Sequence, residues 1–546
     1  MEVSVSVIAK MLGVKGVHFD RVNMVPVLEH RDGQEHIKYE IHVEAAPYKR
    51  LQRRCPICDK KCPEYDVKYD KPPRYRAPNL NGLPVYLLYT PHRIICEEHG
   101  VHTEARPWVD GNTRFTASFN NEIAFQAMFC PKTAISEFFG VNWRSVESCI
   151  EAVHQRLEPD IKRRLIGLTR FCIDETSYKK GHNYMTVITD PETNTVVWLH
   201  DGYGDKVFEQ FALMLTPEQR AAITIIAGDG AKWIDRIAAQ YFPNAHRCID
   251  PFHAVGWATE ALDETRRTLS AAARRQLNQE RAEIEHEAEC RRIEYEKEYA
   301  AYCEAKETLS HIPHHRGPRS RKELELLEVV NHFEHQYNEA IDLLNKRKRA
   351  RLTEEEAARL SELEKKADCI QGCKYAMGMV PEKLSQMNQD RLELLKVNNP
   401  EAYEAYRLKE AFRIIVHMKD EKQAWEELKK WIYEAATSPF EAFRKLAAKI
   451  FRHRHSLMNS IRYSENSSQS EQINGVIKGL IHRANGFKSL DAMFALIYLK
   501  CSDLVIPLDN RYRPTPDIMR QRREKARAQR HRREEARRAK ANVLTA

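Results

Sequence analysis

Hydrophobic and polar positions alternate along the chain in blocks that predict a mixed α/β protein with several domains. Short β-rich runs occupy residues 3–8 (VSVSVI) and 36–45 (HIKYEIHVEA). Three further apolar or β-branched runs follow at 171–176 (FCIDET), 184–189 (YMTVIT) and 195–199 (TVVWL), separated by turn residues. This pattern predicts three successive strands, of which the last two form a hairpin.

The next segment extends these strands into a larger sheet. A polar helix is predicted at 206–215, and residues 222–227 (AITIIA) form a continuous apolar run, which indicates a strand buried on both faces. A helix at 232–241 and a strand at 246–249 follow. The resulting order, βββαβαβ, is that of a ribonuclease H-like domain, in which the first and fourth strands are neighbours.

A helix-turn-helix is predicted before this sheet. Residues 116–157 have helical character, and within them one amphipathic helix ends at Gly140 and a second begins near Trp143. This spacing allows the second helix to enter a major groove, although any short helical hairpin has a similar pattern. The candidate DNA contacts are Thr133, Trp143, Arg144 and Ser145.

Residues 263–449 are dominated by Glu, Lys, Arg, Ala and Leu at helical spacing and predict long helices. The first pair fits an antiparallel coiled coil interrupted near 311–318, and the stretch 425–450 has a stronger apolar stripe that we expect to pack on the core.

A further helix is predicted after small polar residues at 464–470. Its polar face carries Glu471, Asn474 and Lys478, and a second face carries Ile473, Val476 and Ile477. Taken alone, Glu471 has the pattern of a solvent-exposed side chain.

Composition and charge narrow the class of protein. The chain has 546 residues, of which 30% are charged and 42% hydrophobic, and its mean hydropathy is −0.61. It has no apolar run near the ~20 residues that a membrane span requires and no signal-peptide pattern at its start. We therefore expect a cytoplasmic protein whose 13 cysteines are mostly reduced.

The net charge of +9 is concentrated in the C-terminal tail. Residues 520–540 contain eleven Lys or Arg and three Glu, including Arg522, Arg523, Arg532 and Arg533. Such a segment is expected to be disordered and to bind the phosphate backbone of a nucleic acid through counterion release. The alternative is a tail that only increases solubility.

Two chelating pairs predict a zinc site near the N-terminus. Cys55 and Cys58 form one pair, and Cys96 and His99 form the other. Each pair is separated by two residues, so together they can close a tetrahedral Cys3His site in which zinc is structural. The segment between them, 85–95, is expected to form a hairpin. Cys62 and His102 are spare donors, so the fourth ligand stays open, and reduced, unpaired cysteines are the alternative.

Two carboxylates are candidates for a catalytic metal site. Asp174 stands where the first predicted sheet strand surfaces, followed by Glu175, and Asp229 follows the fourth strand. If these strands are neighbours, both aspartates lie at one end of the sheet, where rigidly held oxygen ligands can bind a hard cation. The alternative is that Asp174 and Glu175 only begin a turn.

Taken together, these motifs make the chain resemble the ISL-three type of bacterial insertion-sequence DDE transposases. The resemblance covers about residues 50–500, with the motifs in the order of the family. The matching stretches are CPIC at 55–58, CEEH at 96–99, the helix-turn-helix at 133–147, DETS at 174–177, Asp229 with FPNA at 242–245, DPFH at 250–253, AYRLKE at 405–410, EQIN at 471–474 and RANGF at 483–487.

The resemblance implies a catalytic triad of Asp174, Asp229 and Glu471, which would hold two Mg²⁺ or Mn²⁺ ions, in addition to the structural Zn²⁺. It also implies the terminal inverted repeats of an element and its target DNA as substrates, and a homodimer or higher oligomer on DNA at the bacterial nucleoid. Asp250, His253, Lys478 and Arg483 are candidate supporting residues. The chain departs from the family pattern at Pro251, where a basic residue is usual, and at Ser467, where an Asn is usual.

The implied organisation is a ribonuclease H-like core interrupted by a helical insertion. Its expected parts are a zinc-binding module at 1–110, a helix-turn-helix domain at 111–165, core segments at 166–262 and 451–510, the insertion at 263–450, and the basic tail at 511–546. Two other functions share these features: a DNA-binding regulator derived from an inactive transposase, and a metal-dependent nuclease without strand transfer.

Overall fold

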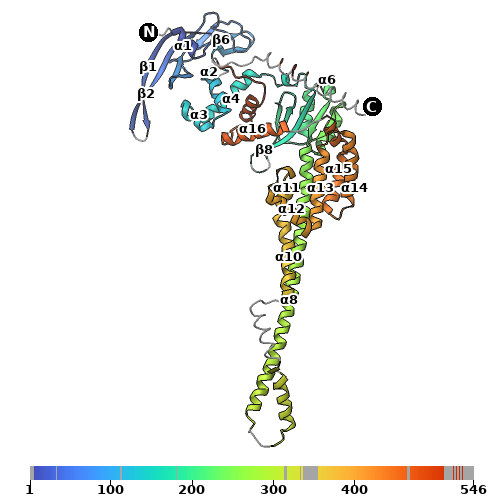
Figure 1. Ribbon diagram of the computed structural model, residues 1–546. Helices are drawn as coiled ribbons and strands as arrows, with labels where there is room; N and C mark the ends of the chain where they lie inside the picture. Colours follow the sequence, from blue (N-terminus) through green and yellow to red (C-terminus); the bar gives the residue numbers. More distant parts are fainter. Residues whose placement is uncertain are drawn as a thin grey trace. The chain divides into compact units, whose positions relative to one another are not determined.

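The computed structural model confirms a mixed α/β, multidomain protein. It divides into two compact units, Met1–Asp250 with Tyr463–Ala546, and Pro251–Arg462 (Figure 1). The residues it describes are 5–31, 34–110, 113–179, 181, 183–312, 317–332, 334–335, 354–463 and 468–508, with 521, 524–525, 528 and 532 in the tail. Within these ranges, the helices are all too short or too polar to span a bilayer.

The first unit begins with a helix and a four-stranded sheet of order β1-β2-β5-β4. Its side chains Val43, Val85 and Leu87 are fully buried with Trp108. The β-rich run at 3–8 was expected to be extended, but Val5–Met11 is helical, because Ile8 and Leu12 then pack on the sheet from one helix face. The elements are α1 (Val5–Met11), β1 (Val17–Arg31), β2 (Gln34–Pro47), β4 (Arg74–Leu80) and β5 (Leu83–Leu88).

A second, three-stranded sheet has the order β3-β6-β7. It is built from β3 (Glu64–Val67), β6 (His92–Cys96) and β7 (Gly100–Thr103). The hairpin expected at 85–95 is therefore wrong, since β5 and β6 belong to different sheets. Pro91 stands between them without a backbone N–H, and the chain passes there from one sheet to the other.

The third sheet carries the candidate catalytic aspartates and has the order β10-β9-β8-β11-β12. Strands β8, β9 and β10 are antiparallel, whereas β11 pairs in parallel with both β8 and β12. The first and fourth strands are neighbours, as the sequence predicts. The strands are β8 (Arg170–Lys179), β9 (Asn183–Asp190), β10 (Thr195–Asp201), β11 (Ile225–Gly228) and β12 (His246–Ile249).

Alternation along β8 divides its side chains between two faces of this sheet. Phe171 and Ile173 pack on one face against Phe208 and Phe211 of α5 and Ile234 of α7. The helices of this region are α5 (Asp205–Met214), α6 (Pro217–Ala222) and α7 (Lys232–Tyr241). Cys172 lies on the other face with Ala227 and Cys248, against Tyr463.

The segment predicted as a helix-turn-helix packs into the same unit as this sheet. It consists of α2 (Ala117–Ala127), α3 (Lys132–Phe139) and α4 (Trp143–Leu157). Gly140 ends α3 with φ +63°, and the Asn142 side chain caps α4, which matches the predicted turn. These helices share one core with α16 (Ser468–Ala484) and α17 (Leu490–Cys501), through side chains such as Val146 and Ile477.

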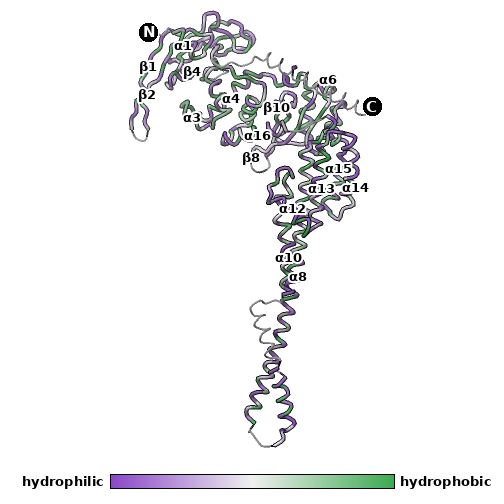
Figure 2. Tube along the Cα trace, viewed as in Figure 1, coloured by the Kyte–Doolittle hydropathy of each residue, from purple (hydrophilic) through white to green (hydrophobic). Residues whose placement is uncertain are grey.

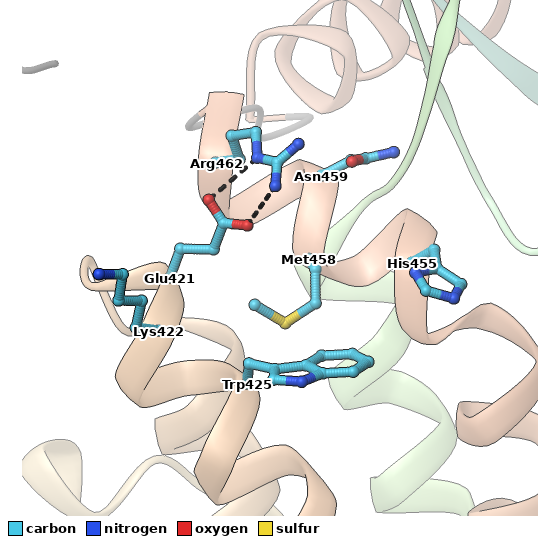
Figure 3. Close-up of a pocket in the computed structure, with 7 residues that line it drawn as sticks. All are labelled: Glu421, Lys422, Trp425, His455, Met458, Asn459 and Arg462. Carbon is cyan, nitrogen blue, oxygen red and sulfur yellow. Dashed lines mark hydrogen bonds and ion pairs between the residues drawn. The ribbon is translucent and has the colours of Figure 1, made fainter.

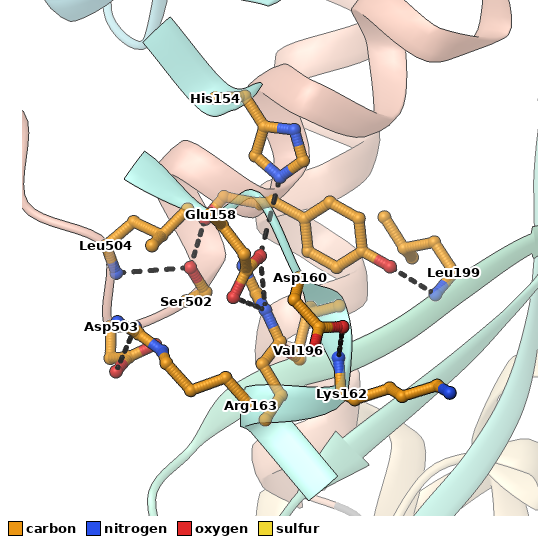
Figure 4. A network of polar contacts seen from close by, with 12 residues as sticks. His154, Glu158, Asp160, Lys162, Arg163, Val196, Leu199, Ser502, Asp503 and Leu504 are labelled. Atoms are coloured by element: carbon orange, nitrogen blue, oxygen red, sulfur yellow. Dashed lines mark hydrogen bonds and ion pairs between the residues drawn. The ribbon is translucent and has the colours of Figure 1, made fainter. Parts of the chain in front are cut away.

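Polar contacts fix the end of α4 against the sheet (Figure 4). The Nε–H of Arg164 is shared between the two carboxylate oxygens of Glu158, at 2.7 Å from each, and Arg164 Nη1 donates to the Val196 carbonyl of β10 at 2.8 Å. His154 Nε2 is 3.5 Å from Glu158 Oε2. Tyr498 of α17 accepts a hydrogen bond of 2.8 Å from the Leu199 backbone N–H of β10. The helices are therefore anchored to the sheet by buried hydrogen bonds as well as by apolar packing.

A buried ion pair joins α3, α4 and the loop after α16, and its loss should lower the stability of this region. Lys132 contacts Glu147 and donates a 2.5 Å hydrogen bond to the Gly486 carbonyl. Glu147 also accepts from the Lys488 backbone N–H. Both ionised side chains are more than 90% buried. Glu147→Gln would leave the Lys132 charge uncompensated, which should destabilise this region by about 3 kcal/mol.

Hydrogen exchange of α3 and α4 measures this effect, and Glu137→Gln on the exposed side of α3 is the control. Unchanged protection in Glu147→Gln would show that the ion pair does not stabilise the helices.

The second unit is a set of helices dominated by one of 60 residues, α8. Arg274 of α8 contacts Gln371 of α10, and Arg281 of α8 binds Glu364, so these two helices run antiparallel. An apolar cluster that includes Leu277 and Leu360 joins them, and hydrophilic and hydrophobic residues alternate along both helices (Figure 2). The helices are α8 (Pro251–Ser310), α10 (Glu354–Gly372), α11 (Lys374–Gly378), α12 (Gln386–Asn398), α13 (Pro400–Val416), α14 (Glu421–Thr437) and α15 (Glu441–Tyr463).

Candidate active site and metal centre

The structure brings the two predicted aspartates together at the end of β8 and β11. Ile173 pairs with Gly228 in parallel register, so Asp174 and Asp229 are the next residues on adjacent strands. Gly228 permits this close pairing, because a Cβ atom there would lie 2.8 Å from the Ile173 carbonyl oxygen. Neighbouring strands are about 4.8 Å apart, so the two carboxylates start from adjacent backbone positions.

Asp229 is held at the strand end by local hydrogen bonds. Its Oδ1 accepts from the Ala231 backbone N–H at 3.0 Å, just before α7. Its backbone carbonyl accepts from the buried guanidinium of Arg247, which also binds Asp235. Arg247 was not predicted as a site residue. The only signal in the sequence was a charged residue directly before the apolar pair Cys248 and Ile249 of β12.

Asp174 contacts helix α16 directly. Its Oδ2 accepts a 2.5 Å hydrogen bond from Asn474 Nδ2, although 300 positions separate the two residues in the chain. Asn474 is 7% exposed, and its Oδ1 has no hydrogen-bond partner among the described residues. This buried, unsatisfied oxygen beside a carboxylate fits a site that binds a hard cation.

Glu471 precedes Asn474 by three positions on α16. Residues three apart share a helix face and are about 4.5 Å apart along the axis, and side chains lean towards the helix N-terminus. Glu471 is exposed, whereas the preceding Ser470 is buried and contacts Thr189 of β9 at 3.0 Å. The N-terminal turn of α16 therefore lies against β8 and β9, with Glu471 and Asn474 on a common face.

The surroundings of this site are strongly acidic. Burial, together with the charges of Asp229 and Asp174, raises the pKa of Glu175 to about 7. Such mutual destabilisation of carboxylates is the electrostatic condition that a bound divalent cation relieves.

The predicted supporting residues lie in different surroundings. Asp250 is buried after β12, and its backbone N–H donates to the Gly228 carbonyl at 3.2 Å. Lys478 is exposed on α16, one turn after Asn474. Arg483 donates to the Met128 carbonyl at the end of α2. His253 belongs to α8 of the second unit.

The apolar face predicted for α16 is partly confirmed. Ile473 and Ile477 are buried, whereas Val476, expected on the same face, is 38% exposed.

The four predicted zinc ligands converge. The donor atoms of Cys55, Cys58, Cys96 and His99 all lie within 4.8 Å of one another, and three of the separations are 3.8, 3.8 and 3.5 Å. Tetrahedral zinc with bonds of about 2.0–2.3 Å requires ligand separations of roughly 3.5–3.8 Å. Three thiols and one imidazole at this spacing are the donor set of a structural zinc site.

The spare donors have other contacts. Cys62 Sγ donates to the Lys60 carbonyl at 3.3 Å, and His102 Nε2 lies 2.6 Å from the His99 carbonyl oxygen. The geometry therefore favours His99 as the fourth ligand.

The predicted DNA contacts of the helix-turn-helix lie on its outer side. Thr133 and Arg144 are exposed, Trp143 is 40% exposed, and Ser145 is half-buried in the first turn of α4. Of the predicted tail contacts, Arg532 is exposed, and Arg522, Arg523 and Arg533 lie outside the described residues.

Comparison with known proteins agrees with this arrangement. A family model described as a transposase, DDE_Tnp_ISL3, matches residues 171–311 and 331–497, from β8 into α17. This match covers more than half of the chain. The chain belongs to the ISL3 transposase family. The protein is therefore a DNA transposase, an enzyme that cleaves DNA and transfers strands.

Individual relatives of this chain are also named as transposases. The transposase for insertion sequence element IS1557 of Mycobacterium tuberculosis, found in strains CDC 1551 and H37Rv, is 29% identical over 455 residues, which cover 83% of this chain and 86% of the relative. The transposase for insertion sequence element IS1001 of Bordetella parapertussis is 25% identical over 196 residues, 34% of this chain and 47% of that protein.

The Asn474 contact leads to a prediction for this transposase. Asn474→Ala removes a hydrogen bond to a charged carboxylate, and such outer contacts typically change metal affinity or activity 10–100-fold. We expect cleavage to fall within this range and the Mg²⁺ concentration for half-maximal activity to rise. Metal titration of the variant tests this, with Gln472→Ala, exposed on the same helix, as the control. An unchanged Mg²⁺ requirement would contradict a role in positioning Asp174.

Proposed function

We propose that this transposase acts through a triad of Asp174, Asp229 and Glu471 on a ribonuclease H-like sheet. The observation that carries the proposal is the Asn474–Asp174 hydrogen bond, which brings the helix of Glu471 to the strand pair of the two aspartates. The sheet order β10-β9-β8-β11-β12 supports the ribonuclease H-like assignment.

The three carboxylates supply oxygen ligands of the kind that Mg²⁺ and Mn²⁺ prefer. When bound, two such ions activate water and a 3′-hydroxyl for attack on phosphodiester bonds. The residues of the chain hold this site in place: Gly228 sets the strand spacing, Arg247 fixes the Asp229 backbone, and Asn474 orients Asp174.

DNA recognition belongs, in this proposal, to the N-terminal modules. Zinc held by Cys55, Cys58, Cys96 and His99 stabilises the first module, and the first turn of α4 reads the terminal inverted repeats of the element. The transposase then works as a homodimer or higher oligomer on element ends and target DNA, in the cytoplasm at the nucleoid.

The experiment that tests the function combines purified protein, labelled element ends and Mg²⁺. Cleaved ends together with products joined to a target plasmid support transposition. Cleaved ends alone indicate a nuclease, and binding without cleavage indicates a regulator with an inactive core.

The basic tail leads to a separate prediction. Eleven basic residues in 520–540 would bind phosphates regardless of sequence. Deleting the tail should weaken binding to all DNA to a similar degree and flatten the dependence of log K on log salt, while the preference for element ends is kept. Binding of specific and unrelated duplexes over a salt series measures this. A truncated protein with the full salt slope would exclude phosphate contact by the tail.

A further inference from the structure

Helix α15, in the second unit, concentrates positive charge. It carries six Lys or Arg residues and one Glu between Glu441 and Tyr463. The other long helices of this unit, α8, α10, α13 and α14, each carry at least as many acidic as basic residues. The charge of α15 is therefore a local feature and does not reflect the composition of the unit.

Four of these basic residues, Arg444, Lys445, Arg452 and Arg462, lie on one exposed face of α15, whereas Lys449 and Arg454 are half-buried. Residues 444, 445, 448, 451, 452, 455 and 462 are exposed, and their spacing follows a helical stripe opposite the buried Phe443, Leu446 and Ile450. From Arg444 to Arg462 the stripe is about 27 Å long at 1.5 Å per residue.

Three guanidinium groups of α15 donate to backbone carbonyls, which do not neutralise their charge. They are Arg444 to Ser438, Arg452 to Ala448 and Arg454 to Phe451. Among the described residues, these three arginines form no ion pair with a carboxylate. The Arg454 guanidinium also lies 4.2 Å from the centre of the Phe451 ring, which is 53% exposed. Positive charge next to an exposed aromatic ring is typical of protein surfaces that bind nucleic acids.

A cleft of about 350 Å³ lies at the C-terminal end of this stripe, between α14 and α15 (Figure 3). Its apolar part is Trp425 and Met458, and His455 stacks on Trp425 with ring centroids 5.9 Å apart. Its rim holds Lys422, Asn459 and an ion pair between Arg462 and Glu421, with a 2.9 Å hydrogen bond from Arg462 Nε.

The rim of the cleft favours a nucleobase over a phosphate as its occupant. A phosphate only accepts hydrogen bonds and is repelled by the Glu421 carboxylate. The edge of a base presents both donors and acceptors, which carboxylate, amide and guanidinium groups can match, and its face can pack on an indole ring.

We propose that α15 is a DNA-binding surface of the helical insertion, on which the exposed arginines contact the backbone of one strand and the Trp425 cleft receives an unpaired base of that strand. The insertion thereby contributes to holding a locally unpaired substrate. This role needs neither the proposed triad nor a bound metal, so it is tested by binding without added Mg²⁺.

The stripe is tested with the full-length protein and a duplex that contains a short single-stranded thymidine gap. Arg444→Gln combined with Arg452→Gln should lower the slope of log K against log salt by about 2. Lys429→Gln with Lys430→Gln removes the same charge from exposed positions of α14 and should leave the affinity nearly unchanged, because both lysines are ion-paired there. If the two double variants change the DNA affinity equally, or if neither changes it, the proposal that α15 is a DNA-binding surface is wrong.

The cleft is tested by comparing the gapped duplex with a fully paired duplex of the same sequence. Trp425→Ala should weaken binding of the gapped duplex about tenfold and leave the paired duplex unchanged, because stacking on an aromatic ring requires an unpaired base. Trp425→Phe should restore most of the loss. If the Trp425→Ala protein binds both duplexes with the affinity of the unaltered protein, the cleft does not bind a base.

Photocrosslinking of the unaltered protein provides a test that no folding defect can affect. A gapped duplex with 5-iodouracil in the gap should crosslink to the α14–α15 peptides that contain Trp425 or His455. Crosslinks found only in other parts of the chain would contradict the proposal.

Discussion

Asp174→Asn, Asp229→Asn and Glu471→Gln should each reduce DNA cleavage by about 1,000-fold or more. Each change removes a ligand charge but keeps nearly the same side-chain shape. Metal ions at such sites supply several kcal/mol of transition-state stabilisation, and about 4 kcal/mol corresponds to a thousandfold change in rate. Strand transfer should fall in parallel, since the proposed mechanism uses the same carboxylates for both steps.

Binding of element ends separates this prediction from misfolding. The three variants should bind ends with close to normal affinity, because the proposed recognition modules lie elsewhere in the chain. Asp205→Asn at the start of α5, whose carboxylate binds the exposed Arg236, is the matched control and should keep full activity. If Glu471→Gln stays active while Asp250→Asn abolishes cleavage, the third ligand is Asp250.

Loss of one zinc ligand should unfold the N-terminal module. The binding free energy of structural zinc in small domains is about 10–16 kcal/mol and is coupled to folding. Cys55→Ser should therefore release the metal and abolish specific binding of element ends. Among the described residues, the apolar cluster around the metal donors contains little beyond Ile94 and the cysteines, so packing there cannot compensate for the lost metal.

Metal analysis and limited proteolysis of the full-length protein measure this outcome. The unaltered chain should contain one zinc ion in this module, and Cys55→Ser should lose it and become cleavable between 50 and 105. Cys62→Ala is the matched control, because Cys62 is also buried in this cluster but its Sγ donates to the Lys60 carbonyl. Zinc loss in Cys62→Ala together with retention in His99→Ala would replace His99 as the fourth ligand.

Several elements could be predicted because their signals are local. The continuous apolar run before Asp229 indicated a strand buried on both faces, and strand β12 and helix α7 have the predicted bounds. The turn at Gly140 was also predictable, since a positive φ favours glycine at the end of a helix. The paired spacing of the cysteines was sufficient to group the four metal donors.

Other features depended on contacts between distant segments. Residues 5–11 have β-branched side chains typical of a strand, yet form a helix because its apolar face covers the first sheet. Residues 85–95 were expected to form one hairpin, but their two strands pair with different partners. Pairing partners far away in the chain leave no local signal.

The sequence by itself determined the order of the strands in the third sheet and the residue types available for metal ligation, because apolar periodicity and ligand spacing are local properties. Only the tertiary structure decided that Asn474 donates a hydrogen bond to Asp174, that Arg247 binds the backbone at the end of β11, and that a cleft at Trp425 lies at the end of the exposed basic face of α15. The physical reason is that hydrogen bonds and charge clusters of this kind join residues that become neighbours only when helices and strands pack.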